Sequence, residues 1–89
     1  MEINEIRSRI DAVDERLLNA FLERMCLAEQ VAEYKQQNGL PLVNVVREKA
    51  VMQKMQENSG EYAQYTQELF STLIKLSKDR QRELFPELK

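Results

Sequence analysis

The chain has 89 residues, enough for one domain near the lower size limit for burying a self-sufficient core. Its 13 basic and 15 acidic residues give a net charge of −2, which argues against a generic nucleic-acid binder because such proteins are clearly basic. No apolar run approaches the ~20 residues of a membrane span. The opening MEINEIRSR is polar and Cys26 is the single cysteine, so we expect no secretory leader, no internal disulfide and a cytoplasmic location.

The first predicted element is a long helix over about residues 4–38, because Gly39 is a natural helix stop and Pro41 follows it. Apolar residues recur along it at helical spacing and form one stripe: Ile6, Ile10, Val13, Leu17, Ala20, Ala28 and Val31. Two cations, Arg24 and Lys35, fall in the same stripe, about 16 Å apart along the axis. Charged groups are almost never buried unpaired, so two cations on this face imply an anion from the protein or from a ligand.

Two shorter helices follow. Asn44 is the predicted N-cap of a helix over about residues 45–57, and the Asn-Ser-Gly sequence of residues 58–60 ends it. A third helix is predicted over about residues 61–84, and Pro86 closes it. No alternation typical of strands is present, so we expect an all-α fold with three helices in a single domain over residues 1–89.

The length of the first helix predicts a second copy of the chain. A helix over residues 4–38 spans about 50 Å, whereas a compact globule of this size has a radius of gyration of about 12 Å. The two shorter helices cannot cover the whole stripe, and a monomer would leave a large apolar patch in water. We therefore expect an intertwined helical-bundle homodimer with the long helices side by side.

Polar side chains also lie on the apolar faces of the two shorter helices. Glu48 shares a face with the apolar residues of the second helix, and Arg47 lies at its margin. Ser77 lies within the apolar band of the third helix, and Gln81 lies at its edge. A single residue of this kind is more often a snorkelling side chain or a member of a core ion pair. Three helices that each direct polar groups inward instead predict a cavity with a polar lining.

Arg7 links the predicted cavity to the predicted dimer. It flanks the stripe of the first helix but lies about 25 Å from Arg24 along the axis. It cannot reach a ligand beside Arg24 of its own chain. If Arg7 contributes to the cavity, it must come from an antiparallel partner helix.

The residue types limit the chemistry of this cavity. The chain offers no histidine, metal-ligand cluster, glycine-rich phosphate loop or nucleophile–base pair, so we expect no metal, no cofactor and no covalent step, and we interpret Cys26 as inert. Arginine binds carboxylates bidentately, and a lysine and a neutral amide can donate to an oxygen that gains charge. Glu48 can accept from a hydroxyl. The best match is a dicarboxylate with a hydroxyl and an ether oxygen, held in a reactive shape.

Three segments of the chain together resemble the all-helical chorismate mutases. They read IRSRIDAVDERLLNAFLERMCLAEQVAEYK, VNVVREKAV and LFSTLIKLSKDRQ, and with their spacing they cover nearly the whole chain. The resemblance implies an intertwined dimer with two equivalent active sites. It also implies the rearrangement of chorismate to prephenate, a unimolecular Claisen rearrangement on the route to phenylalanine and tyrosine.

The resemblance further implies the residues that act on the substrate. Arg24 and Arg7 of the partner subunit would grip the two carboxylates, and Lys35 and Gln81 would donate to the ether oxygen. Gln81 is the neutral variant of a position that is sometimes Glu. A neutral amide needs no proton to donate, so we expect a flat activity profile around neutral pH.

Four further residues would complete the site. Glu48 would hold the ring hydroxyl, Arg47 would support the charge of the site, and Ser77 would touch a carboxylate. The family often has Asp at the position of Asn44. If the family contact is made by the backbone, nothing is lost here; if it is made by the carboxylate, recognition of the hydroxyl depends more heavily on Glu48.

Two other interpretations stay open at the level of sequence. An isochorismate-pyruvate lyase resembles this fold and eliminates pyruvate by a related pericyclic reaction; the difference would lie in loop closure and substrate pose, with residues 36–43 the segment of interest. A non-catalytic helical dimer or regulatory module would instead pair Arg24 with an inward-facing acid. Only Glu48 is clearly available for three or four cations, which weakens that interpretation.

Overall fold

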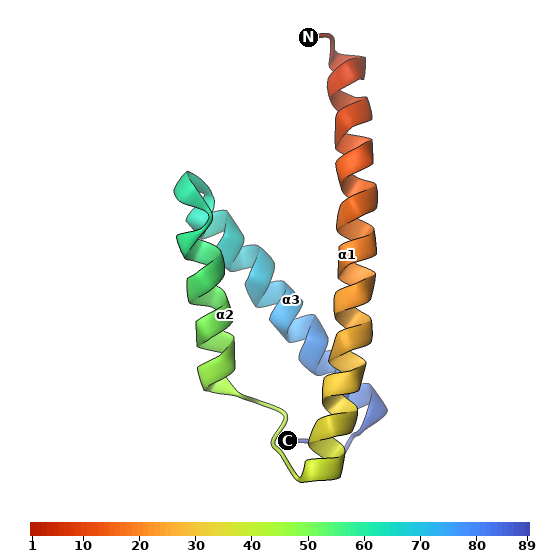
Figure 1. Ribbon diagram of the computed structural model, residues 1–89, viewed down its shortest axis with the longest axis vertical. Coiled ribbons are helices and arrows are strands. Elements are labelled where there is room, and N and C mark those ends of the chain that lie inside the picture. Colours follow the sequence, from red (N-terminus) through yellow and green to blue (C-terminus); the bar gives the residue numbers. More distant parts are fainter.

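Three α-helices account for most of the computed structural model, which describes residues 1–89 (Figure 1). They are α1 (Ile3–Asn38), α2 (Val45–Glu57) and α3 (Ala63–Leu84), with a 3-10 turn, η1 (Gly60–Tyr62), between α2 and α3. No strand is present, so the predicted all-α fold with one very long helix is confirmed. No helix combines the length and apolar character needed to cross a membrane.

Local chemistry sets the end of α1 and the start of α2 where the sequence predicts them. Gly39 adopts a left-handed conformation with φ of 63°, and its N–H bonds to the carbonyl of Lys35, which closes the last turn of α1. Asn44 is the N-cap of α2, and its side-chain oxygen accepts from the backbone N–H of Arg47 at 3.0 Å. The loop between these caps is therefore short and fixed at both ends.

The third helix starts later than predicted. Residues Gly60–Tyr62 form the tighter η1 turn, and the α-helix begins at Ala63 rather than near residue 61. The hydroxyl of Ser59 lies 2.6 Å from both the Met55 carbonyl and the Thr66 hydroxyl, which ties the end of α2 to the first turn of α3. A 3-10 turn is common at such a helix start because it reverses the chain in few residues.

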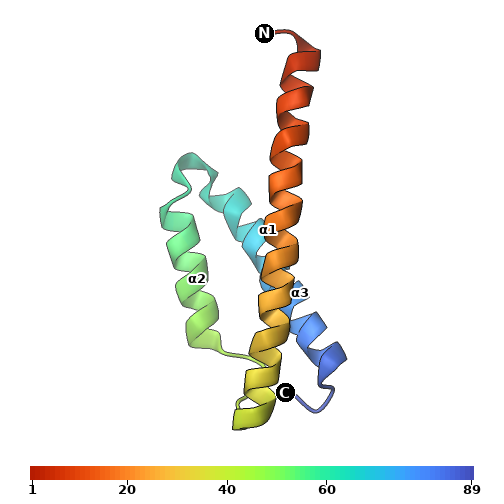
Figure 2. The same cartoon turned by 45° about the vertical axis from the view of Figure 1, so that its right-hand side comes forward.

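The long helix α1 forms a rod, and α2 and α3 form a helical hairpin beside it. α3 packs against both α1 and α2, whereas α1 and α2 lie apart, as the two views in Figures 1 and 2 agree. Between α1 and α3, the guanidinium of Arg80 binds the carboxylate of Glu29 at 2.8 Å. The N-terminal end of α1 projects beyond the hairpin, and the chain measures 54 × 24 × 14 Å. Its radius of gyration, 16.1 Å, exceeds the value of about 12 Å for a compact globule of this length.

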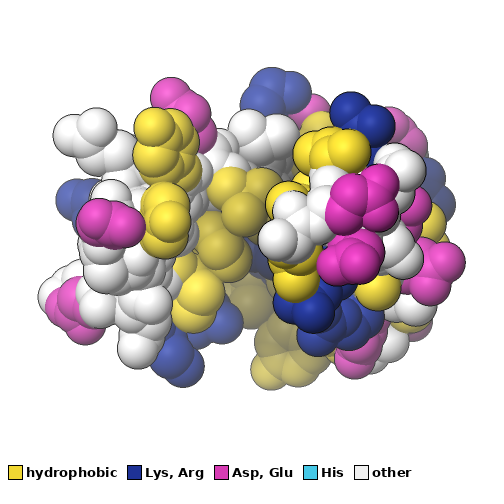
Figure 3. Space-filling view, turned by 90° about the horizontal axis from the view of Figure 1, so that it is seen from above, with side chains coloured by type: hydrophobic (Ala, Val, Ile, Leu, Met, Phe, Trp, Pro, Cys, Tyr) yellow, Lys and Arg dark blue, Asp and Glu magenta, His cyan; other side chains and the backbone are white.

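The buried core is small and lies at one end of the rod. It consists of Ala32, Leu42 and Leu88, with Phe85 packed against them, so the C-terminal segment covers the loop that follows α1. Much of the predicted apolar stripe of α1 is exposed, and Leu17 is 54% exposed. Figure 3, which looks along α1 from its N-terminal end, shows hydrophobic side chains gathered between α1 and the hairpin. The single chain thus leaves uncovered the surface for which the sequence predicts a partner.

Candidate active site

A cavity of about 290 Å³ lies between α1, α2 and α3. The loop after α1 also contributes to its wall. Every site residue predicted from the sequence except Arg7 lines it: Arg24, Lys35, Asn44, Arg47, Glu48, Ser77 and Gln81. The remaining lining is Lys78 and apolar side chains: Leu27, Ala28, Val31, Leu42, Val51 and Ile74. Polar groups that are far apart in the sequence are therefore gathered around one partly apolar space.

A chain of hydrogen bonds connects α1 with α3 across the cavity. Lys35 Nζ donates to Gln81 Oε1 at 2.9 Å and to the Leu42 carbonyl at 2.6 Å, and Gln81 Nε2 donates to Ser77 Oγ at 3.0 Å. An ammonium has three N–H donors and a primary amide has two. Lys35 and Gln81 therefore each keep one N–H that no protein group uses. Both residues line the cavity, so these donors remain for a ligand.

The ammonium of Lys35 is partly withdrawn from water. Burial lowers the pKa of Lys35 below its usual 10.5, the charge of Lys78 lowers it further, and the carboxylate of Glu48 opposes both effects. A cation in such a poorly hydrated place interacts with a developing negative charge more strongly than a cation in water does. The site thus holds a donor suited to stabilising charge on a bound oxygen.

The two arginines of the cavity have no carboxylate partner. Arg24 Nη1 makes one long contact, 3.5 Å, with the Leu73 carbonyl, and Arg47 forms no side-chain hydrogen bond. A structural module would pair Arg24 with an inward acid, and no such pair is present. Both guanidinium groups remain available for carboxylates of a ligand.

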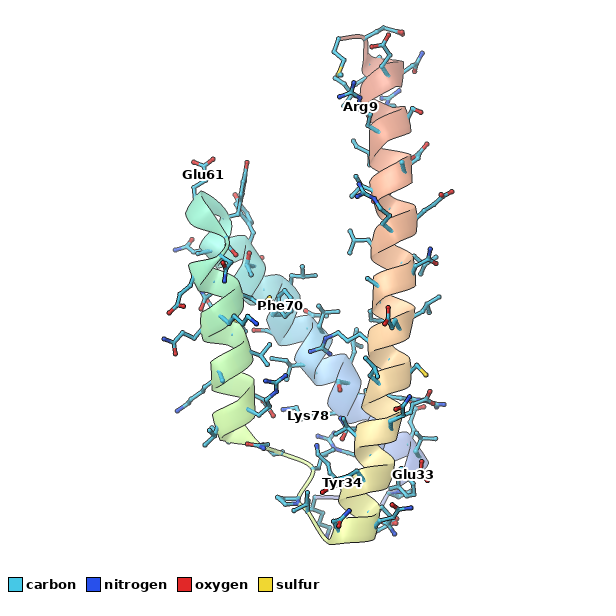
Figure 4. All side chains as sticks on the ribbon, viewed as in Figure 1. Arg9, Glu33, Tyr34, Glu61, Phe70 and Lys78 are labelled. Carbon is cyan, nitrogen blue, oxygen red and sulfur yellow. The ribbon has the colours of Figure 1, made fainter.

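Lys78 is a lining residue that the sequence interpretation missed. Its Nζ lies 3.2 Å from Glu48 Oε1, and Figure 4 shows its side chain reaching from α3 toward α2. Its spacing in the sequence could have identified it, because Lys78 precedes Gln81 by three positions and therefore lies on the same helix face. With Lys78 the cavity holds four cations against the single carboxylate of Glu48.

The side chain of Asn44 caps α2 and also lines the cavity. Its Oδ1 already accepts from the backbone N–H of Arg47 as the cap of α2, whereas its amide N–H groups make no hydrogen bond within the protein. An amide N–H can donate a hydrogen bond to a ligand oxygen, but it cannot accept a hydrogen bond from a hydroxyl. Among the lining residues, Glu48 is the carboxylate that can accept from a hydroxyl.

Arg7 is not brought to the cavity of its own chain. It lies in the N-terminal half of α1, does not line the cavity, and stands about 25 Å from Arg24 along the helix. The helix is continuous between the two residues, so no local rearrangement can bring them together. Within one chain, the site therefore lacks the contribution predicted for Arg7.

Comparison with known proteins gives a family match over most of the chain. Residues 6–82 match the family model of chorismate mutase type II. A chorismate mutase of Methanocaldococcus jannaschii is 36% identical over 61 residues, which cover 68% of this chain and 62% of that protein. A T-protein of Haemophilus influenzae is 39% identical over 51 residues, which cover 57% of this chain and 14% of that protein. The match thus spans less than two thirds of the length of either relative, and no solved structure matches significantly.

Proposed function

Because this chain belongs to the chorismate mutase type II family, we propose that it is an isomerase that rearranges chorismate to prephenate in phenylalanine and tyrosine biosynthesis. In this reaction the ether C–O bond breaks while a C–C bond forms within the same molecule, so no second reactant is consumed. The observation that carries the proposal is that Lys35 and Gln81 each keep an unused N–H, in a cavity with unpaired arginines. Positioning and charge stabilisation are all that such a rearrangement requires.

The arginines hold the two carboxylates of the substrate. Arg24 takes one of them, a role supported by the absence of any acidic partner in the protein. Arg7 of the partner subunit takes the other. Ser77, which lines the cavity, touches a carboxylate, and Arg47 adds positive charge to the cavity. Planar bidentate pairing fixes the orientation of the substrate as well as its affinity.

Lys35 and Gln81 act at the ether oxygen. Negative charge grows on this oxygen as the C–O bond breaks, and donors that are already in place stabilise it without reorganisation. This role is supported by the hydrogen bond between the two side chains, which fixes both of them before a ligand arrives. The interactions strengthen in the transition state, so they raise the rate of turnover rather than only the affinity.

Glu48 accepts from the ring hydroxyl of the substrate. Asn44 is less suited to accept from it than a carboxylate is, because its one oxygen is already engaged as the helix cap. Recognition of the hydroxyl therefore depends mainly on Glu48. We also propose a cytoplasmic location, since a single unpaired thiol such as Cys26 is usual in a reducing compartment.

Two chains form the working enzyme, an intertwined homodimer with two shared sites. The proposal is supported by the exposed apolar residues in the N-terminal half of α1: Ile6, Ile10, Val13 and Leu17. Antiparallel packing of two α1 helices covers these residues. It also carries Arg7 of each chain toward the cavity of the other, which no movement within one chain can do.

Product identification tests the proposed reaction. The protein is incubated separately with chorismate and with isochorismate, and the products are separated and identified. Prephenate from chorismate supports the proposal. Pyruvate released from isochorismate, without prephenate formation from chorismate, would show a lyase instead. An Arg82→Ala variant serves as the control, since Arg82 lies outside the cavity on an exposed part of α3.

A further inference from the structure

Lys78 and Glu48 form an ion pair in the wall of the cavity. Their charged atoms lie 3.2 Å apart and join α3 to α2 (Figure 4). The two side chains are 23% and 29% exposed, so both are largely withdrawn from bulk water. Among the four cations of the cavity, Lys78 is the one with a carboxylate partner.

Because of this ion pair, the Glu48 carboxylate already has a partner before any ligand binds. Its Oε1 already faces an ammonium, and its side chain makes no other hydrogen bond within the protein. Oε2 has no partner within the protein, so it is the oxygen that we expect to accept from the hydroxyl of a ligand. A ligand with a hydroxyl adds a second partner to this carboxylate, whereas a ligand without one leaves the first partner in place.

This arrangement bears on how strongly the cavity discriminates between ligands. A site that binds a hydroxyl rejects the analogue without it because the buried polar group of the protein is then left unpaired. The penalty is largest for a charged group that has lost its water. An ion pair that persists in the absence of the hydroxyl removes most of that penalty.

We propose that Lys78 is a specificity-determining residue that keeps Glu48 paired when a ligand offers no hydroxyl there. The cavity then tolerates dicarboxylates whose ring hydroxyl is absent or displaced to another carbon. The inference rests on the proposed function, because that function supplies the dicarboxylate and its hydroxyl. It adds a determinant of selectivity that Glu48 alone does not provide.

The test compares two stable ligands by calorimetry. One is a bridged bicyclic ether dicarboxylate that imitates the cyclic transition state and carries the ring hydroxyl; the other is the same compound without the hydroxyl. The measured quantity is the ratio of their dissociation constants. We expect a ratio below about tenfold in the wild type, and an increase of about tenfold or more in Lys78→Met. Lys78→Arg keeps the cation and should keep the ratio of the wild type.

A matched control lies one turn earlier on the same helix. Lys75 is 71% exposed, pairs with Asp79 and does not line the cavity, so Lys75→Met should leave the ratio unchanged. Circular dichroism shows whether each variant is folded. If Lys78→Met does not fold, Lys78→Leu gives the same comparison with a different apolar side chain.

The outcomes separate the two proposals. An unchanged ratio in the apolar Lys78 variants, or an equal increase in Lys75→Met, overturns the role of Lys78. A wild type that binds both compounds but does not convert chorismate overturns the proposed reaction, while the ratio still decides the role of Lys78. Failure of the wild type to bind either compound overturns both.

Discussion

Lys35 Nζ and Gln81 Oε1 lie 2.9 Å apart, although 46 positions separate the two residues in the sequence. The contact determines which end of the amide faces the ammonium. Because Oε1 is held by Lys35, the amide nitrogen points elsewhere, and one of its N–H groups bonds Ser77 Oγ. A cation on α1 thus orients a neutral donor on α3 for use in the cavity.

Replacing this amide by a carboxylic acid should make activity depend on acid. In Gln81→Glu, the ionised side chain has no proton to donate and places negative charge beside the ether oxygen. We expect kcat/KM at about pH 7.5 to fall about a hundredfold and to recover as the pH approaches about 5. A steady-state pH series checks this, and a flat profile at low activity would contradict it.

The wild-type profile should be flat across neutral pH and fall in alkali. Gln81 is neutral, so kcat/KM should be constant between about pH 5 and 8. At higher pH, Lys35 loses the proton that it donates, and its pKa lies below 10.5 because of burial. Activity should therefore decline with an inflection below 10.5. An inflection at or above that value, or a steep optimum in acid, would count against the assignment.

Removing Lys78 should move that alkaline inflection. The charge of Lys78 lowers the pKa of Lys35, so Lys78→Met should raise the inflection toward higher pH. Glu48 acts in the opposite direction, and Arg24 and Arg47 are the other cations that line the same cavity. The free-enzyme profile of kcat/KM is the suitable measurement, because a bound dianion would itself raise the pKa of Lys35. A shift of the inflection to lower pH would show that Lys78 does not lower the pKa of Lys35.

Arg24 should matter for turnover far more than for folding. Its one hydrogen bond is 3.5 Å long, and it has no acidic partner, so Arg24→Ala removes an unpaired cation from a partly buried place. We expect kcat/KM to fall by a factor of about a thousand or more, while the free energy of unfolding stays within about 1 kcal/mol of the wild type or rises. Urea denaturation and kinetics measure the two effects. Arg82→Ala is the control, and a large loss of stability in Arg24→Ala alone would make Arg24 a structural residue.

Features that depend on interactions between residues close in the sequence could be predicted, whereas features that depend on contacts between different helices could not. Gly39 and Asn44 act on their own helix ends, so the boundaries that they set were predictable to the residue. The periodicity of each helix identified its inward polar side chains. It could not reveal that Lys78 meets Glu48, because this contact depends on how α2 crosses α3. The packing of Leu88 on the loop after α1 is missed for the same reason.

The N-terminal half of α1 should control assembly. Leu17 is a large apolar residue on the exposed stripe, and a carboxylate there cannot be buried against a second chain without a large desolvation cost. We expect Leu17→Asp to convert a dimer into monomers and to abolish turnover. Sedimentation velocity over a range of concentrations measures the first effect. Asn19→Asp places the same charge on the opposite face of α1 and should remain dimeric; a dimeric Leu17→Asp would contradict the proposed interface.

Mixing two inactive variants tests whether each site is shared between chains. Arg7→Ala and Arg24→Ala should each be inactive alone, because every site then lacks one arginine. In a mixed dimer, one of the two sites combines Arg24 of one chain with Arg7 of the partner subunit, and the other site lacks both. Random exchange in an equal mixture should therefore restore about a quarter of the wild-type activity. Exchange is verified with chains of different mass, and no recovery after verified exchange would exclude a site completed by the second chain.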